Sequence, residues 1–178
     1  MTKLPLLAAA MLPLAACQAE PVAVEGNGPA PAVTATTQGR PSQEVSPISG
    51  LPLVPLQIRS GGKVHRFTVE VATTADEQAY GLMNRNRLGP NEGMVFPMSP
   101  ARPASFWMKN TLIPLDMIFV RADGSVARIA AMTTPHSLES VGVSEPVAAV
   151  LEIPGGRARE LGIGADARIS WPGGPSPR

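Results

Sequence analysis

The chain's densest run of polar and aromatic residues lies around Trp107, with Lys109 and Asn110 close behind it. An aromatic ring beside amine and amide donors is typical of a small-molecule site. Asp116 follows within an apolar run, where a carboxylate is costly to bury unless it is paired, and Lys109 or Arg85 could be its partner. These residues form the candidate binding site. The alternative is a tight turn in which Asp116 or Asn110 hydrogen-bonds backbone amides.

A second carboxylate in an apolar run, Glu152, brings catalysis into consideration. Two carboxyl groups that face one cleft can divide acid and base work, as in glycoside hydrolysis. A hydrolase that uses Asp116 and Glu152 is therefore an alternative to a binding module. The sequence contains no nucleophile elbow, phosphate-binding P-loop or zinc-protease motif. Catalysis stays open, and we favour a non-catalytic binding or envelope-associated role.

Metal and anion sites are further alternatives. His65 and His136 lie in different segments and offer too few ligands for zinc, so we expect no metal site and no cofactor. Methionine thioethers bind Cu(I), although methionine is more often a flexible core residue. A copper-handling protein could draw on Met83, Met94, Met98, Met108, Met117 and Met132. The pair Gly155-Gly156 before a short helix could hold an anion or simply begin the helix.

The N-terminus has the features of an export signal. Lys3 supplies a positive charge, and residues 4–14 form an apolar run too short to cross a bilayer, which needs about 20 residues. The run ends in Leu14-Ala15-Ala16-Cys17, which resembles the lipobox of bacterial lipoprotein precursors. The resemblance implies removal of residues 1–16 and lipidation of Cys17, with an ordinary secretory signal as the alternative. Gln18 replaces the aspartate that favours inner-membrane retention, so we expect the periplasmic face of the outer membrane.

Composition divides the rest of the chain into a tether and one domain. Residues 17–55 are rich in proline and alanine and hold no aromatic residue. They should not bury enough apolar surface to offset the entropy lost on ordering, so we expect a disordered tether. Every aromatic residue lies between 67 and 171, which places the domain at residues 56–172 and a disordered tail at 173–178. A net charge of +1 gives no basic surface for nucleic acid. The expected partners are a membrane, through the lipid, and a small molecule; the oligomeric state is open.

Alternation and turn residues predict a β-rich domain. Alternating residues around Gly61-Gly62 predict a hairpin over 56–71, and a capping box at Thr74 predicts a short helix to Leu82. Recurring prolines predict surface loops. We place further strands at 93–96, 106–108, 115–120, 126–131, 148–153 and 167–171, a helix at 157–161, and loops at 97–103 and 133–146. The inventory indicates an α+β fold, a compact antiparallel, barrel-like β domain with two short helices.

Three blocks of sequence resemble one known family, domain of unknown function 192. The first block covers residues 81–96, the central block is FWMKNTLIPLDMIF at 106–119, and the last covers 150–163. The resemblance spans about residues 56–171 and implies a compact β-rich domain with small flanking helices. It implies no activity, because the family is named for lacking one. Members usually carry a Gly-Asp pair before the final strand, where this chain has Gly164-Ala165-Asp166-Ala167.

Overall fold

The computed structural model describes residues 44–175, which belong to one compact unit. The export signal, Cys17 and residues 17–43 lie outside the described residues. Within 44–175, no helix is long and apolar enough to cross a membrane.

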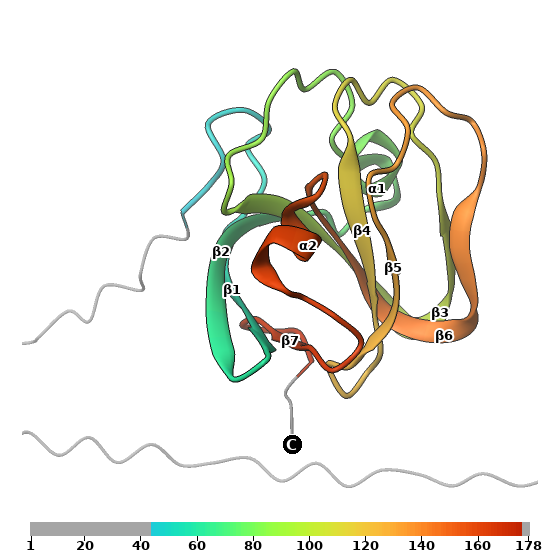
Figure 1. The fold of residues 1–178 in the computed structure, drawn as a ribbon. Helices are drawn as coiled ribbons and strands as arrows, with labels where there is room; N and C mark the ends of the chain where they lie inside the picture. Colours follow the sequence, from blue (N-terminus) through green and yellow to red (C-terminus); the bar gives the residue numbers. More distant parts are fainter. Residues whose placement is uncertain (1–43, 176–178) are drawn as a thin grey trace, which may run out of the picture. The chain divides into compact units, whose positions relative to one another are not determined.

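The described chain is mostly strand, arranged in a single sheet. Its elements are β1 (Leu53–Ser60), β2 (Lys63–Val71), α1 (Ala75–Tyr80), β3 (Glu92–Phe106), β4 (Leu115–Val120), β5 (Val126–Ala130), β6 (Val141–Pro154), α2 (Arg157–Leu161) and β7 (Arg168–Ser170). The strand order is β5-β4-β6-β3-β2-β1-β7 (Figure 1). Neighbouring strands are antiparallel except β2 and β3, which are parallel because the chain crosses over through α1. The sheet is therefore mixed.

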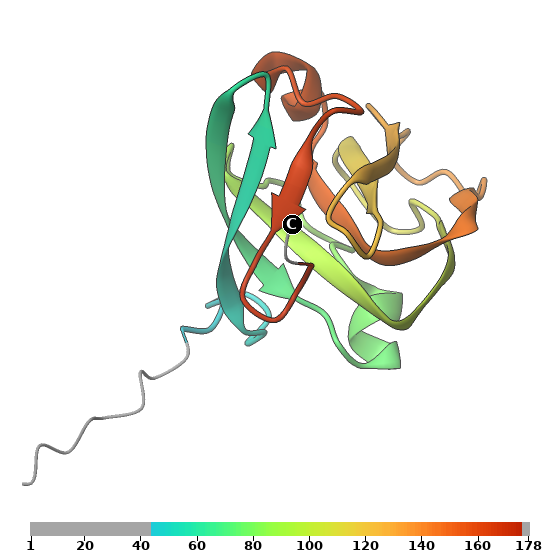
Figure 2. The ribbon, with the colours of Figure 1, turned by 90° about the horizontal axis from the view of Figure 1, so that it is seen from below.

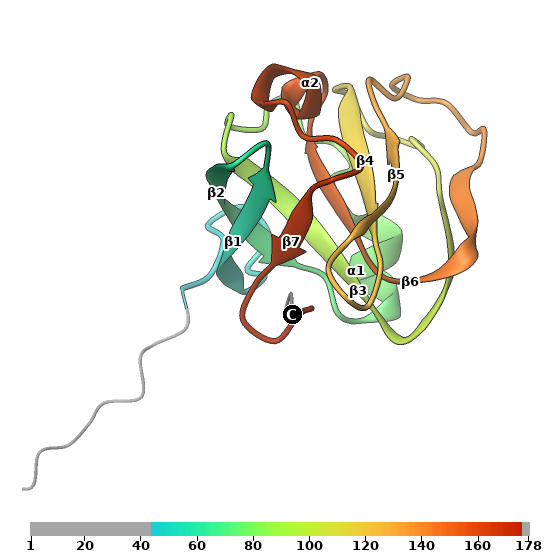
Figure 3. The same cartoon turned by 60° about the horizontal axis from the view of Figure 1, so that its bottom comes forward.

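The sheet curls into a half-barrel. An isolated bridge joins Ser125, in the β4–β5 turn, to Arg168 at the start of β7, and the Ile169 amide donates to the Gly124 carbonyl at 2.8 Å. Figures 2 and 3 show this approach, with β7 next to the β1–β2 hairpin on one side and near the β4–β5 turn on the other. The expected barrel-like β domain with two short helices is confirmed, but the sheet is not wholly antiparallel as expected, because β2 and β3 run parallel.

Local sequence explains the first hairpin and the first helix. Gly61 and Gly62 both have positive φ, which only glycine adopts readily, and they reverse the chain between β1 and β2. Thr74 caps α1, since its hydroxyl accepts from the Glu77 amide while the Glu77 carboxylate accepts from the Thr74 amide. Both predictions are confirmed, and so is the strand at 115–120.

The loops predicted at 97–103 and 133–146 were wrong in part. Residues 97–103 continue β3, and residues 141–146 begin β6. Strand β3 pairs Pro97 with Ala149 but Arg102 with Val147, so extra residues of β3 bulge out between the two pairs. A bulge leaves residues outside the hydrogen-bond ladder, which is where a strand tolerates prolines that cannot donate.

Residues 44–55, assigned above to the tether, are folded. The Leu53 amide donates to the Glu44 carbonyl, and the Val71 amide to the Pro52 carbonyl. Ser49 donates its hydroxyl proton to the buried carboxylate of Glu70. The segment is held by hydrogen bonds, and the tether was assigned because its composition offers little apolar surface to bury. Composition therefore did not reveal that these residues are folded.

Each face of the curled sheet carries its own buried apolar cluster. One cluster includes Ile118, Leu151, Ile153 and the α2 residue Ala158. The other includes Met94, Phe96, Met117 and Val150 on β3, β4 and β6, with Leu82 from the turn after α1. Strand β4 is buried along its whole length, so its residues alternate between the two clusters.

Candidate functional site

Asp116 holds backbone amides together on the α2 side of the sheet. It is fully buried, and its carboxylate accepts three hydrogen bonds of 2.8 Å, from the amides of Met132, Gly156 and Ala158. Gly156 and Ala158 lie at the start of α2, where free amides and the helix dipole favour an anion. The amides at the start of α2, considered as a possible anion site, bind the side chain of Asp116 itself, which favours the structural alternative for this residue.

Neither basic residue considered as a partner of Asp116 contacts it. Arg85 instead forms a buried bidentate ion pair with Glu70, in which its two terminal guanidinium nitrogens lie 2.6 and 2.7 Å from the two carboxylate oxygens. Burial works to raise the pKa of Glu70, but hydrogen bonds from Arg85 and Ser49, together with the Arg85 charge, hold it below its usual value. Arg85, one of the candidate binding residues, is therefore occupied by a structural contact.

Asp116 and Glu152 do not share a cleft. In the β4–β6 register, Asp116 lies opposite Ile153 and Met117 lies opposite Glu152. Residues opposite each other share a face, and successive residues alternate faces, so the two carboxyl groups point to opposite sides of the sheet. The carboxylate pair that a hydrolase would need is not assembled.

Glu152 is a buried acid that has no hydrogen-bond partner within residues 44–175. It is 4% exposed and lies between Met94 of β3 and Met117 of β4 on the same face. No group among residues 44–175 donates a hydrogen bond to its carboxyl group, and burial alone raises its pKa to about 8. At neutral pH this carboxyl group is therefore mostly protonated and uncharged.

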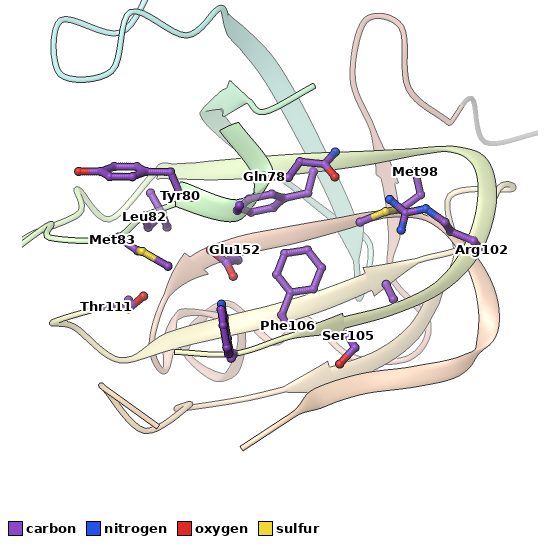
Figure 4. Close-up of a pocket in the computed structure, with 15 residues that line it drawn as sticks. Gln78, Tyr80, Leu82, Met83, Met98, Arg102, Ser105, Phe106, Thr111 and Glu152 are labelled. Carbon is purple, nitrogen blue, oxygen red and sulfur yellow. The ribbon is translucent and has the colours of Figure 1, made fainter. Parts of the chain in front are cut away.

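The Glu152 side chain lies at a cavity of about 230 Å³. Figure 4 shows its carboxyl group directed into the space between Met83, Thr111 and Phe106. The walls come from α1 and the turn after it, from β3 and from the segment that follows β3. We refer to this space as the Glu152 cavity.

Aromatic rings make up much of the wall. Phe96 and Phe106 meet edge to face, with ring centroids 5.0 Å apart. Tyr80 and Trp107 also line the cavity and remain 57% and 49% exposed, so they lie where it opens to solvent. Such a wall offers apolar contact and ring faces that attract cations.

The remaining candidate binding residues lie beside the cavity. The Lys109 ammonium lies 5.1 Å from the centre of the Trp107 ring, a cation–π distance. Asn110, which has a positive φ of 55°, directs its amide toward the Met83 sulfur at 3.9 Å. Of the candidate binding set, Trp107 is the member that lines the cavity, while Lys109 and Asn110 support its lining residues.

Sequence reasoning missed most of the cavity, including Arg102. This residue fell in the stretch expected to be a surface loop, whereas the structure places it in β3 with its side chain along the cavity wall (Figure 4). Gln78 and Leu82 reach the wall from the α1 region, far away in sequence. The available signal was Glu152 itself, an acid inside an otherwise apolar strand.

The methionines are mainly core residues. Met94, Met108 and Met117 are at most 1% exposed within an apolar cluster. Met83 and Met98 do line the cavity, but at separate places along its wall in Figure 4. Among residues 44–175, no group of three or more histidine, cysteine or acidic side chains is placed to hold a metal ion.

Comparison with models of known protein families assigns the chain to a family. The model of domain of unknown function 192, described as "Uncharacterized ACR", matches residues 56–171. The chain belongs to the DUF192 family. The match covers β1 from Leu56 through β7, and so includes every strand and helix that forms the cavity.

Two solved structures resemble this DUF192 domain. A protein of unknown function from Novosphingobium aromaticivorans DSM 12444 is 45% identical, with a TM-score of 0.71 over 73% of this chain and 93% of that one. A putative transcription regulator from Sinorhizobium meliloti 1021 is 35% identical, with a TM-score of 0.67 over 68% of this chain and 95% of that one. A comparison with curated proteins gives no match.

Proposed function

We propose that this DUF192 protein is a lipid-anchored envelope protein whose folded domain binds a small organic molecule in the Glu152 cavity. The observation that carries the binding role is a buried carboxyl group that faces an open cavity and has no hydrogen-bond partner among the described residues. A ligand with a polar hydrogen would supply the missing partner.

The free energy of burial supports a ligand. An unpaired buried polar group costs about 1–3 kcal/mol in proteins, and a buried charge costs more. A Met in place of Glu152 would fill the same strand position without that cost. A buried titratable group in a cavity whose pKa is displaced by desolvation is a feature of functional sites.

The cavity supports binding better than hydrolysis. A two-carboxylate hydrolase needs its carboxyl groups within about 5–10 Å across one cleft. Asp116 lies on the other face of the sheet with three amide donors already bound. The only acidic side chain lining the cavity within residues 44–175 is Glu152, and it faces aromatic and thioether groups.

The envelope location rests on the N-terminal sequence. A positive residue, a short apolar run and the lipobox-like Leu14-Ala15-Ala16-Cys17 together favour export and lipidation. One lipid chain binds membranes only marginally, so stable anchoring would require more than one acyl chain on Cys17.

A fragment screen followed by protein NMR tests the binding role. We expect fragments that carry an amine or other hydrogen-bond donor to shift amide signals of residues around Glu152, Phe106 and Gly81. The Ala79→Phe variant adds a ring at the cavity wall and should abolish these shifts; Ala122→Phe, at an exposed position in the β4–β5 turn outside the cavity lining, should not. Shifts that persist in Ala79→Phe, or fragments that bind only elsewhere, would contradict the proposal.

A further inference from the structure

Two formally charged side chains line the Glu152 cavity, and they have opposite signs. Glu152 has no hydrogen-bond partner within residues 44–175. Arg102, at a solvent-exposed position of β3, makes no ion pair in the described part of the chain, where the ion pairs are Arg85–Glu70, Arg121–Glu145 and Arg157–Glu160. An unpaired cation and an unpaired acid at one cavity complement a molecule that carries both charges.

The distance between the two residues indicates the length of such a molecule. Arg102 pairs with Val147, and Met94 pairs with Glu152, so the two charged residues lie at β6 positions five residues apart. Five residues of extended strand span at most roughly 16 Å. The gap between the charged groups is shorter than this, because two long side chains reach into the same cavity from a strand pair that contains a bulge. Figure 4 shows the Arg102 side chain directed back toward Met98, with Phe106 between it and Glu152 in this view. The two groups form no ion pair with each other, and the cavity wall that they share includes the apolar rings of Phe96 and Phe106.

We infer that the Glu152 cavity binds a zwitterion whose amine and anionic group are separated by an apolar chain. The inference rests on the proposed binding function and names its ligand class. The ammonium group would lie at Glu152, among ring faces that attract cations. The apolar chain would pack against Phe96 and Phe106, and the anionic group would pair with Arg102, whose guanidinium suits a carboxylate. An α-amino acid is too short to reach both ends.

Proton release gives this binding mode a distinct signature. The other titratable groups along the cavity wall are the Tyr80 hydroxyl and the Arg102 guanidinium. The β3 and β4 neighbours of Glu152, Met94 and Met117, do not titrate. Because burial keeps the empty carboxyl group protonated at pH 7, an arriving ammonium should expel that proton into the buffer. A neutral or anionic ligand would leave the proton in place.

Calorimetry on the full chain in mild detergent tests the inference with four probes: 6-aminohexanoate, hexylamine, hexanoate and hexane-1,6-diamine. We expect 6-aminohexanoate to bind about tenfold more tightly than hexylamine, the gain of one charge-assisted contact, and to release close to one proton at pH 7. Hexanoate should bind weakly without proton release. The diamine should bind no better than hexylamine, because its second ammonium meets Arg102.

Two substitutions assign the ends of the probe. Glu152→Gln should weaken 6-aminohexanoate binding at least about tenfold and abolish proton release. Arg102→Gln should reduce the affinity for 6-aminohexanoate to that for hexylamine while keeping proton release. The matched controls Glu139→Gln and Arg66→Gln, both at exposed positions, should change neither value.

The outcomes separate this inference from the proposed function. Hexanoate binding as tightly as 6-aminohexanoate, or an affinity unchanged in Arg102→Gln, would overturn the zwitterion. If fragments occupy the cavity but 6-aminohexanoate does not, the ligand class is wrong and the binding role stands. If neither fragments nor probes bind there, both proposals fail.

Discussion

Asp116 and Glu152 lie one position out of register on the paired strands β4 and β6, so two buried carboxyl groups face opposite sides of one sheet. Their surroundings differ accordingly. Asp116 accepts three backbone hydrogen bonds, whereas Glu152 has no donor among the described residues and faces a cavity. The first carboxyl group stabilises the fold, and the second is available to a ligand.

Asp116→Asn should lower the free energy of unfolding by about 1–3 kcal/mol. The amide keeps the shape of the side chain, but its NH₂ group would face backbone amides that also donate. Lys109→Ala is the matched comparison and should change stability by no more than about 0.5 kcal/mol, since the exposed Lys109 loses one cation–π contact. Denaturant unfolding at pH 7 measures both. A large loss in Lys109→Ala with none in Asp116→Asn would reverse the assignment of roles.

The free energy of unfolding should fall as pH rises from about 4.5 to about 8 because of Glu152. Burial raises its folded pKa to about 8 from 4.5, so between these values the folded chain holds a proton that the unfolded chain has lost. Each pKa unit corresponds to about 1.4 kcal/mol. Below pH 4.5 Glu152 is protonated in both the folded and the unfolded state, and above pH 8 it is ionised in both. Its effect on the pH dependence of stability is therefore confined to the range between these values.

Glu152→Gln should remove that slope and make the protein more stable than the parent chain at pH 8. Glu139→Gln, the same change at an exposed position, should keep the parent's pH dependence. Denaturant midpoints between pH 4 and 9 provide the measurement. Parallel profiles for the parent chain and Glu152→Gln would mean that this carboxyl group ionises normally in the folded state.

Deleting residues 44–52 should destabilise the domain, contrary to the tether assigned from composition. A chain that begins at Leu53 loses the Glu44 and Pro52 carbonyl contacts and the Ser49 hydroxyl that bonds Glu70. We expect a loss of at least about 1 kcal/mol, which lowers Tm by a few degrees. A chain that begins at Glu44 is the control. Equal Tm values for the two chains would show that the segment adds no stability.

Cys17→Ser should release the protein from membranes, because it removes the acceptor for the lipid. Fractionation of cells after a high-salt wash measures this, and mass spectrometry of the parent chain should find acyl chains on Cys17. Membrane association of the variant together with normal removal of residues 1–16 would contradict the lipoprotein assignment.

Local patterns in the sequence were sufficient for much of the fold. The Gly61-Gly62 turn, the Thr74 capping box and the apolar run at β4 each depend on neighbouring residues, and each appears as expected. The strands predicted for β3 and β6 were too short, because prolines in these segments were interpreted as loop signals. In the structure, a bulge accommodates prolines within the strand. The parallel pairing of β2 with β3 depends on where α1 directs the chain, which no local pattern specifies.

The site was harder to infer than the fold. Glu152 stood out as an acid in an apolar strand, yet the alternative hydrolase hypothesis paired it with Asp116, because sequence alone does not give the register between β4 and β6. A one-residue difference in register decides whether two side chains share a face. Arg102 and Phe106 join Glu152 only through the curl of the sheet.

A crystal structure of the domain soaked with the strongest-binding NMR fragment tests the central claim most directly. The expected result is a fragment in the Glu152 cavity with a polar atom within hydrogen-bond distance, about 2.6–3.2 Å, of the Glu152 carboxyl group and its apolar part against Phe106. A fragment bound outside the cavity, or a protein side chain that fills the cavity and hydrogen-bonds Glu152, would contradict the account.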